Sequence, residues 1–386
     1  GHWHNLGVKN ENQKPMNPQE VFCPNAMCLA SGQIGKGNIS VHSQKERRYK
    51  CNVCHKTFAE TTGTPFYRAH KVHSLITLVI TLLAYGCPVQ AIVAAFGWDE
   101  RTVKRMQAAA GEHCQEVHEH LVEQPRDLQH VQADEIWVKA QGVILWLAMA
   151  IQVETRLWLG AEMGKRRDKT LLKALMRRVR ASALCRPLLF CVDGFSAYVQ
   201  TIQATFRESI KSGPLGRPRL RPWDSIQIAQ VVKQYAGRRV VGVVRRICRG
   251  TAPQIKALIH VSQGHGGINT AYIERLNATF RARLATLVRR GRSLVQQLPT
   301  LQAGVYLVGT VYNFCTYHDS LRVELLLPYG RRRWLKRTPA IAAGITDHWW
   351  SLDELLHYQV PKPPILPKRR GRPSQAFLEL QKQWLG

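Results

Sequence analysis

Three acidic residues of this chain have the types and positions that metal-dependent chemistry needs. Asp134 lies in the apolar stretch ADEIW, Asp193 in VDGFSAY, and Glu274 in the helical stretch YIERLN. Two aspartates and a glutamate brought together can hold two divalent metal ions for phosphodiester chemistry. Mg²⁺ or Mn²⁺ is the expected ion, because these ions prefer oxygen ligands. Nothing else in the sequence supplies a nucleophile or a cofactor.

The helix that carries Glu274 offers further groups on the same face. Asn277 and Arg281 follow Glu274 at positions i+3 and i+7, so the three side chains are neighbours. A carboxylate beside an amide and a guanidinium suits a metal next to a phosphate. The alternative is that Asp134, Asp193 and Glu274 are ordinary strand-end or helix-surface acids. That interpretation is given to the remaining nearby acids, Glu135, Glu154, Glu162, Asp168 and Asp224, of which Asp224 is the strongest rival to Asp193.

An α/β domain must position these acids. Apolar stretches predict three consecutive strands, then an amphipathic helix, then a fourth strand that ends at Asp193. Their expected ranges are 131–140, 143–153, 156–163, 169–180 and 187–192. This order is typical of a ribonuclease-H-like sheet, in which the first and fourth strands are neighbours. Asp134 and Asp193 are therefore expected to lie side by side.

The composition favours a nucleic-acid partner. The 386 residues include 55 Lys and Arg against 26 Asp and Glu, a formal charge of +29. A phosphate backbone is the commonest partner for such an excess, with a ribosomal or membrane-surface protein as the alternative. No stretch has the pattern of a membrane-surface helix or the length of a membrane span. We expect a cytoplasmic, nucleoid-associated prokaryotic protein without a membrane partner, and the polar start of the chain shows no secretory signal.

Four of the ten cysteines have metal-like spacing. Cys23 and Cys28 form a C-x4-C pair, and Cys51 and Cys54 form a C-x2-C pair. Four thiolates match tetrahedral zinc, so the sequence predicts a zinc ribbon with a structural Zn²⁺. Two alternatives stay open: His55 replaces one thiolate, or the four are unrelated core cysteines. The other six are interpreted as reduced core thiols.

Helical patterns over 75–82, 89–96 and 100–110 follow the cysteines and resemble a helix-turn-helix. Asp99 is the expected N-cap of the last helix. Its exposed residues would contact DNA in the major groove; they are Arg101, Thr102, Lys104 and Arg105. A generic helical bundle is the alternative. The histidines that follow, His113, His118 and His120, are interpreted as solvated.

The C-terminal part adds a capping box at Ser351 and a Pro-rich linker over 361–367. Arg370, Gly371 and Arg372 resemble the core of an AT-hook, which inserts arginines into an A·T minor groove. The alternative is an unspecific solvated tail. His318, in NFCTYH, either helps to position DNA or protonate a leaving oxygen, or has a structural role.

In these motifs the chain resembles transposases of the insertion-sequence-1 type, within the DDE transposase and integrase superfamily. The resemblance runs from the cysteine pairs through the helix-turn-helix to ADEIW, VDGFSAY and IERLNATFR, in the family's order. It implies that Asp134, Asp193 and Glu274 are the catalytic, metal-binding triad, with Asn277 and Arg281 near DNA. The chain departs from the family in the x4 spacing of the first cysteine pair, in the 80 residues between Asp193 and Glu274, and in the residues beyond 321.

The resemblance implies a DNA transposase that binds terminal inverted repeats, cleaves element ends and joins the 3′-hydroxyl to target DNA. A homodimer in a synaptic complex is expected. The alternatives are a zinc-ribbon transcriptional regulator and a nuclease of the same fold without strand transfer. The expected domains are a zinc ribbon (1–60), a helix-turn-helix domain (61–125), a ribonuclease-H-like catalytic domain (126–320) with a basic insertion near 205–267, and a C-terminal extension (321–386).

Overall fold

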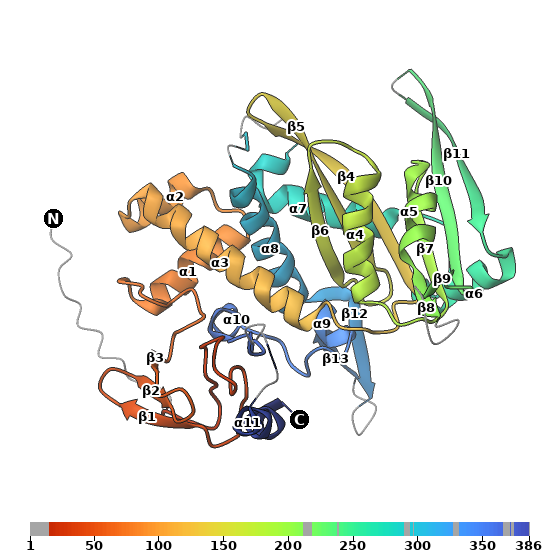
Figure 1. Cartoon of the computed structure of the whole chain (residues 1–386). Helices are drawn as coiled ribbons and strands as arrows, with labels where there is room; N and C mark the ends of the chain where they lie inside the picture. Colours follow the sequence, from red (N-terminus) through yellow and green to blue (C-terminus); the bar gives the residue numbers. More distant parts are fainter. Residues whose placement is uncertain are drawn as a thin grey trace. The chain divides into compact units, whose positions relative to one another are not determined.

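The chain forms two compact units in the computed structural model, one of Gly1–Ala69 with Gln359–Gly386 and one of His70–Tyr358. Figure 1 shows their elements. The structure describes residues 15–210, 218–237, 239–288, 294–295, 297–326, 332–365, 371 and 374–385. The arginines of the predicted hook, Arg370 and Arg372, and the polar start of the chain lie outside the described residues.

The first unit joins the cysteine-rich segment to the C-terminal residues. Its antiparallel three-stranded sheet has the order β1-β2-β3, and a C-terminal helix follows the Pro-rich segment. Ser31 donates a hydrogen bond to the carbonyl of Lys362 (3.1 Å), and the amide of Ile365 donates to the carbonyl of Ala26 (2.7 Å). Trp384 packs against the apolar cluster around the cysteines. The elements are β1 (Ile39–Ser43), β2 (Arg48–Cys51), β3 (Thr57–Ala59) and α11 (Gln375–Leu385).

The second unit opens with three helices that follow the predicted pattern, α1 (His73–Ala84), α2 (Val89–Phe96) and α3 (Glu100–Leu121). Gly97 ends α2 with a φ of +63°, a left-handed conformation that favours glycine. The predicted cap is confirmed, because Asp99 accepts a hydrogen bond from the amide of Arg101 (2.8 Å). No helix among the described ranges is long and apolar enough to cross a lipid bilayer.

Helix α3 extends about ten residues beyond its predicted end, and this corrects the interpretation of its histidines. His113 and His118 are buried rather than solvated. His113 bonds to the carbonyl of Leu355 through Nε2 (2.9 Å), and the His118 ring lies 4.5 Å from the ring of Trp158. Burial lowers the pKa of His118 to about 3, so the ring is neutral.

A six-stranded mixed sheet of order β11-β10-β7-β4-β5-β6 forms the centre of the second unit. The β4–β7 and β7–β10 pairs are parallel, and the other pairs are antiparallel. Strand β10 lies within the span 205–267 and pairs with the strand that ends at Asp193. The strands are β4 (His130–Ala140), β5 (Val143–Gln152), β6 (Trp158–Gly164), β7 (Leu188–Asp193), β10 (Ile226–Ala236) and β11 (Arg239–Arg249).

Helices cover both faces of this sheet, which buries the nearly continuous apolar run of β5. On one face, Phe280 and Val305 pack against Ile136 and Leu147 of the strands. On the other face lie α4 and α5 (Figure 1). The first face is formed by α6 (Ala252–Gln263), α7 (Ala271–Arg283), the 3₁₀ helix η1 (Ala285–Leu287) and α8 (Leu298–Phe314), and the second by α4 (Lys169–Ala181) and α5 (Ala197–Thr205).

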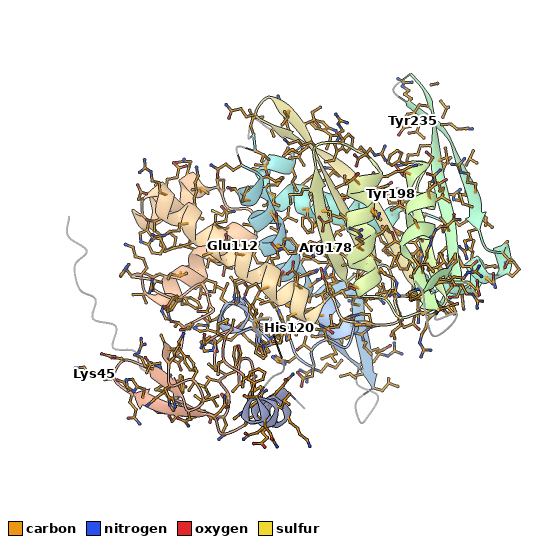
Figure 2. The ribbon with its side chains drawn as sticks, in the orientation of Figure 1. Lys45, Glu112, His120, Arg178, Tyr198 and Tyr235 are labelled. Atoms are coloured by element: carbon orange, nitrogen blue, oxygen red, sulfur yellow. The ribbon has the colours of Figure 1, made fainter. Side chains whose placement is uncertain are left out.

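In the central sheet, the outer part of the β10–β11 hairpin projects beyond the other strands (Figures 1 and 2), and Tyr235 is exposed there.

Two further strand pairs and two short helices complete the second unit. Ser351 caps the last helix of the unit through the amide of Glu354 (3.1 Å), as the capping box predicts. The remaining elements are β8 (Arg207–Ile210), β9 (Arg219–Pro222), β12 (His318–Leu326), β13 (Arg332–Arg337), α9 (Pro339–Ala342) and α10 (Leu352–His357).

The close approach of α3 to α8 gives a test of this packing. A Cβ atom at Gly111 would lie 2.2 Å from the carbonyl oxygen of Ala303. Gly111→Ala is therefore expected to destabilise the unit by about 1–3 kcal/mol, because backbone must move, although alanine favours the helix itself. The free energy of unfolding in urea measures the change. Gly267→Ala adds a Cβ in open space and should change stability little; an unchanged or more stable Gly111→Ala variant would contradict this packing.

Candidate active site

The structure brings Asp134 and Asp193 together at neighbouring parallel strands. Ala133 of β4 is in register with Val192 of β7, so the following residue of each strand is an aspartate on the same face. A carboxylate oxygen of Asp134 and one of Asp193 lie within 4.8 Å of each other. The expected adjacency of these two acids is present.

Glu274 reaches the same cavity from the first turn of α7. The cavity, of about 720 Å³, is lined by Asp134, Asp193 and Glu274 together with Asn277 and Arg281. Glu274 accepts hydrogen bonds from Lys233 Nζ (2.8 Å) and Thr270 Oγ1 (3.1 Å). Its carboxylate is directed to these partners rather than into the tight group that Asp134 forms.

A single glutamine side chain holds α7 against β4. Gln132 Oε1 accepts hydrogen bonds from the amides of Tyr272 (3.0 Å) and Ile273 (3.1 Å), two first-turn groups without a partner inside the helix. Gln132 and Asp134 share one face of β4 because side chains alternate along a strand. Asp134 consequently meets α7, where Asn277 Nδ2 donates to it (2.8 Å). Asn277 is buried and contacts this acid.

Glu135 is part of the acidic group, which corrects its interpretation as an ordinary acid. Its carboxylate lies within 4.8 Å of those of Asp134 and Asp193, and the side chain is fully buried. It faces the opposite side of β4, toward Tyr198 of α5. The sequence signal for this role was weak, because an acid next to Asp134 in a strand normally points away from its neighbour.

Arg167 joins the acids from the second face of the sheet. Its Nε donates to Glu135 Oε2 (2.9 Å), and its guanidinium also pairs with Asp193. The guanidinium stacks 4.4 Å from the Phe195 ring centre and 5.7 Å from that of Trp146. Sequence patterns did not indicate Arg167, because it precedes α4 in a run of basic residues.

The crowding of carboxylates disfavours their charged forms. Burial raises the pKa of Asp134 to about 7, and the charges of Glu135, Asp193 and Glu274 raise it further. Burial also raises the pKa of Glu135. Arg167 pairs with Glu135 and Asp193, and Lys233 pairs with Glu274. A divalent cation would relieve the remaining repulsion, and oxygen donors suit Mg²⁺ or Mn²⁺.

The four cysteines of the first unit form a second candidate metal site. One sulfur atom from each of Cys23, Cys28, Cys51 and Cys54 lies within 4.8 Å of the others. The Sγ atoms of Cys23 and Cys54 are 3.7 Å apart, and those of Cys28 and Cys51 are 3.9 Å apart. Four sulfurs in this arrangement fit tetrahedral Zn²⁺ and a zinc ribbon. His55 is exposed and outside this group.

The residues predicted to contact DNA on α3 lie on its outer surface. Arg101, Lys104 and Arg105 are exposed and Thr102 is half-buried. Lys104 pairs with Glu100 (2.7 Å).

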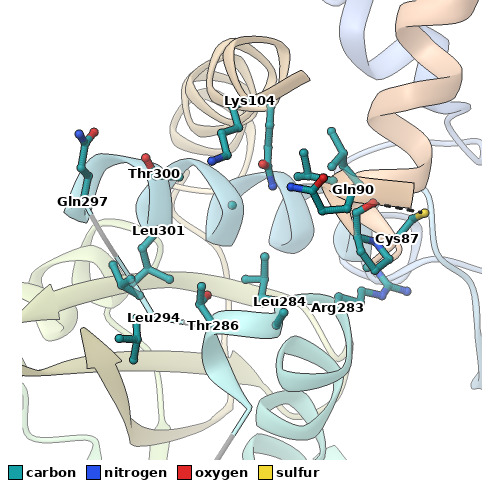
Figure 3. A pocket seen from close by; sticks show the side chains of 18 of the residues that line it. Cys87, Gln90, Lys104, Arg283, Leu284, Thr286, Leu294, Gln297, Thr300 and Leu301 are labelled. Carbon is teal, nitrogen blue, oxygen red and sulfur yellow. Dashed lines mark hydrogen bonds between the residues drawn. The ribbon is translucent and has the colours of Figure 1, made fainter. Parts of the chain in front are cut away.

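Lys104 and Arg105 also line a cavity of about 770 Å³ between α3 and the segment that follows α7 (Figure 3). In Figure 3, Lys104 extends from α3 toward Thr300 and Leu301 of α8.

The structure also describes three other predicted residues. Asp224, the rival of Asp193, is exposed and pairs with Arg221. His318 is outside the acidic cavity, and its ring contacts that of Tyr312 at 4.6 Å. Gly371 occupies a bend with a φ of +99°, while its neighbouring arginines are not described.

No protein-family model matches this chain, and no curated protein matches it significantly. The resemblance of its motifs to transposases therefore stays a hypothesis.

The cysteine site predicts one zinc ion per chain. Cys28→Ser should lose that ion, and unfolding of the first unit should follow because such small sites fold around their metal. Elemental analysis of the purified protein measures zinc content. Cys185→Ser, which alters an exposed cysteine of the second unit, is the matched control and should retain the ion; equal zinc in both variants would contradict the site.

Glu135 predicts a measurable change in divalent-ion binding. Glu135→Gln removes one charge from the acidic group and should weaken Mn²⁺ binding about tenfold or more, as loss of a ligand or of its supporting partner does. Calorimetric titration with Mn²⁺ gives the affinity. Glu154→Gln changes an exposed acid in the turn between β5 and β6, and its affinity should equal that of the unaltered protein. Equal affinities for both variants would exclude Glu135 from the site.

Proposed function

We propose that the chain is a DNA transposase of the DDE type, which binds the ends of a mobile element, cleaves them and joins the released 3′-hydroxyl to target DNA. The observation that carries this proposal is the common cavity of Asp134, Asp193 and Glu274. Acids from two adjacent parallel strands and from one helix provide oxygen donors around a space that a phosphodiester can enter.

The sheet supports the same proposal. Strands β6, β5 and β4 are successive antiparallel neighbours, and β7 and β10 continue the sheet in parallel with β4. This is the order that the hypothesis of a ribonuclease-H-like catalytic domain requires. Ligands of open α/β sheets bind at the carboxyl ends of the strands, and Asp193 is the last residue of β7.

Each lining residue has a role in this proposal. Asp134, Asp193 and Glu274 would hold the divalent ions, with Glu135 as a further candidate ligand. Two such ions, when bound, activate the attacking oxygen and stabilise the leaving one. Asn277 keeps the carboxylate of Asp134 oriented through its amide. Arg281, at the cavity wall, would attract the phosphate of the scissile strand.

The parts that bind DNA are assigned by charge and by shape. The +29 excess of the chain favours a polyanionic partner. Helix α3 would read the terminal inverted repeat with Arg101, Thr102, Lys104 and Arg105, and the cysteine unit would contribute further contacts. A homodimer would hold two element ends in a synaptic complex. The AT-hook-like residues would grip flanking or target DNA, and the protein would act at the nucleoid.

A strand-transfer assay tests the proposal. The protein, Mg²⁺, the DNA of its own element's end and a target plasmid should give joined products. Asp193→Asn should reduce joining about 10²-fold or more, because it replaces a carboxylate oxygen that would hold the divalent ions. Asp224→Asn is the matched control, since Asp224 is exposed; its joining rate should be unchanged.

Two alternative functions give different outcomes in the same assay. A nuclease of the same fold would cut the element end and never join it. A zinc-ribbon transcriptional regulator would bind DNA without either product, and Glu274→Gln would leave its binding and regulation intact. Absence of joined product, together with equal behaviour of Asp193→Asn and the unaltered protein, would exclude the transposase.

A further inference from the structure

Basic side chains gather on the side of α7 that faces away from the acidic cavity. Arg283 follows Glu274 by nine residues, which is half a turn more than two full turns and reverses the direction of the side chain. Arg275 lies on the flank of the same helix. Arg156, in the turn between β5 and β6, and His318, at the start of β12, approach from other elements. These four residues are called the basic cluster.

Aromatic and hydroxyl groups fix the basic cluster in place. The guanidinium of Arg283 lies 4.5 Å from the ring centre of Tyr85, and that of Arg156 lies 4.1 Å from the ring centre of Tyr272. Arg283 Nη2 is 3.5 Å from Thr316 Oγ1. Stacking on rings restricts the arginines without using up their hydrogen-bond donors.

Tyr312 connects the two arginines to His318. The His318 and Tyr312 rings are 4.6 Å apart. Burial lowers the pKa of His318 to about 4, and the charges of Arg283, Arg156 and Arg275 also lower it, whereas Asp319 raises it. Three arginines thus face one aspartate, and the cluster has an excess of positive charge.

Three nitrogen atoms of the basic cluster are buried without a hydrogen-bond partner in the described part of the chain. Arg156 Nη1, Arg283 Nη1 and His318 Nε2 are shielded from solvent, and none has a hydrogen-bond partner among the described residues. Neither Arg156 nor Arg283 forms an ion pair within those residues. Unpaired buried donors are costly, and for charged groups the cost is greater. An acceptor that carries negative charge would remove this cost.

We propose that Arg156, Arg283 and His318 form a binding site for a phosphate group, with Arg275 at its rim. Planar guanidinium groups match the oxygens of a phosphate, and two of them can bind one anion. We favour DNA that passes along α7 as the molecule that supplies this phosphate group from its backbone. This choice rests on the proposed function. Free phosphate has the same chemistry and is the other source.

The DNA source is tested by the salt dependence of binding. The affinity of the full chain for a fluorescein-labelled duplex is measured by anisotropy at several salt concentrations. Each phosphate contact contributes about 0.9 to the slope of log affinity against log salt. Because both arginines would bind the same phosphate, Arg156→Gln and Arg283→Gln should each flatten the slope by part of that amount, and the double variant, which loses the whole contact, by about 0.9. Arg283→Lys keeps the charge and should keep the slope while it weakens binding.

The matched control is Arg177→Gln. Arg177 is exposed on α4, on the other face of the sheet, and the substitution removes the same charge. Its slope should equal that of the unaltered protein. A purely structural role of the two arginines predicts instead a lower melting temperature in their variants without any change of slope.

Free phosphate is tested by thermal melting in the absence of DNA. Inorganic phosphate should raise the melting temperature of the unaltered protein and of Asp193→Asn, and should have a smaller effect on the double variant. This effect does not require catalysis, so it survives if the transposase proposal fails. A phosphate effect with unchanged DNA slopes would assign the site to free phosphate. No phosphate effect and slopes equal to that of Arg177→Gln would overturn the proposal.

Discussion

The candidate active site depends on the hydrogen bonds between Gln132 and the start of α7. The two amides that Gln132 accepts from belong to Tyr272 and Ile273, and the same side chain donates to the carbonyl of Asn269 (2.8 Å). The buried side-chain amide of Gln132 therefore holds the first turn of α7, and the residue before that turn, against β4. Strand alternation then brings Asp134 to the helix one position further along the same face. This local contact therefore brings Glu274 of α7 into the same cavity as Asp134 of β4, although the two acids are far apart in the sequence.

Electrostatic repulsion is the opposing constraint. The carboxylates of Asp134, Glu135 and Asp193 meet where β4 and β7 lie side by side, and Glu274 of α7 lines the same cavity. Buried acids of like charge raise one another's pKa. Arg167 and Lys233 each contact the group from a different side, and the aromatic rings beside Arg167 keep its guanidinium in place. The lining of the cavity therefore includes the acids and also Arg167, Lys233 and Arg281. The acids suit a divalent ion, and the basic residues suit a phosphate.

The sequence predicted most of the central strands, because their apolar runs are long and bounded by turns; β4, β5 and α4 lie within about two residues of their expected ranges. The predicted strand order also placed Asp134 and Asp193 side by side. Glu135, Arg167 and Gln132 could not be found in this way, since their roles depend on which face of a strand or loop meets another element. The buried histidines were missed because α3 reads as polar, although its inward stripe packs against α8.

The two parts of the first unit are separated in the sequence by the whole second unit, so the first unit is completed only after the second has been synthesised. Cys23 to Cys54 leave the ribosome before the second unit, whereas Lys362, Ile365 and Trp384, which complete their surroundings, leave after it. At ordinary translation speeds the delay is on the order of tens of seconds. The cysteine cluster must therefore stay reduced and soluble in an incomplete environment while the whole of the second unit is synthesised. Interrupted synthesis would leave a polypeptide with the acids in place and the first unit unfinished.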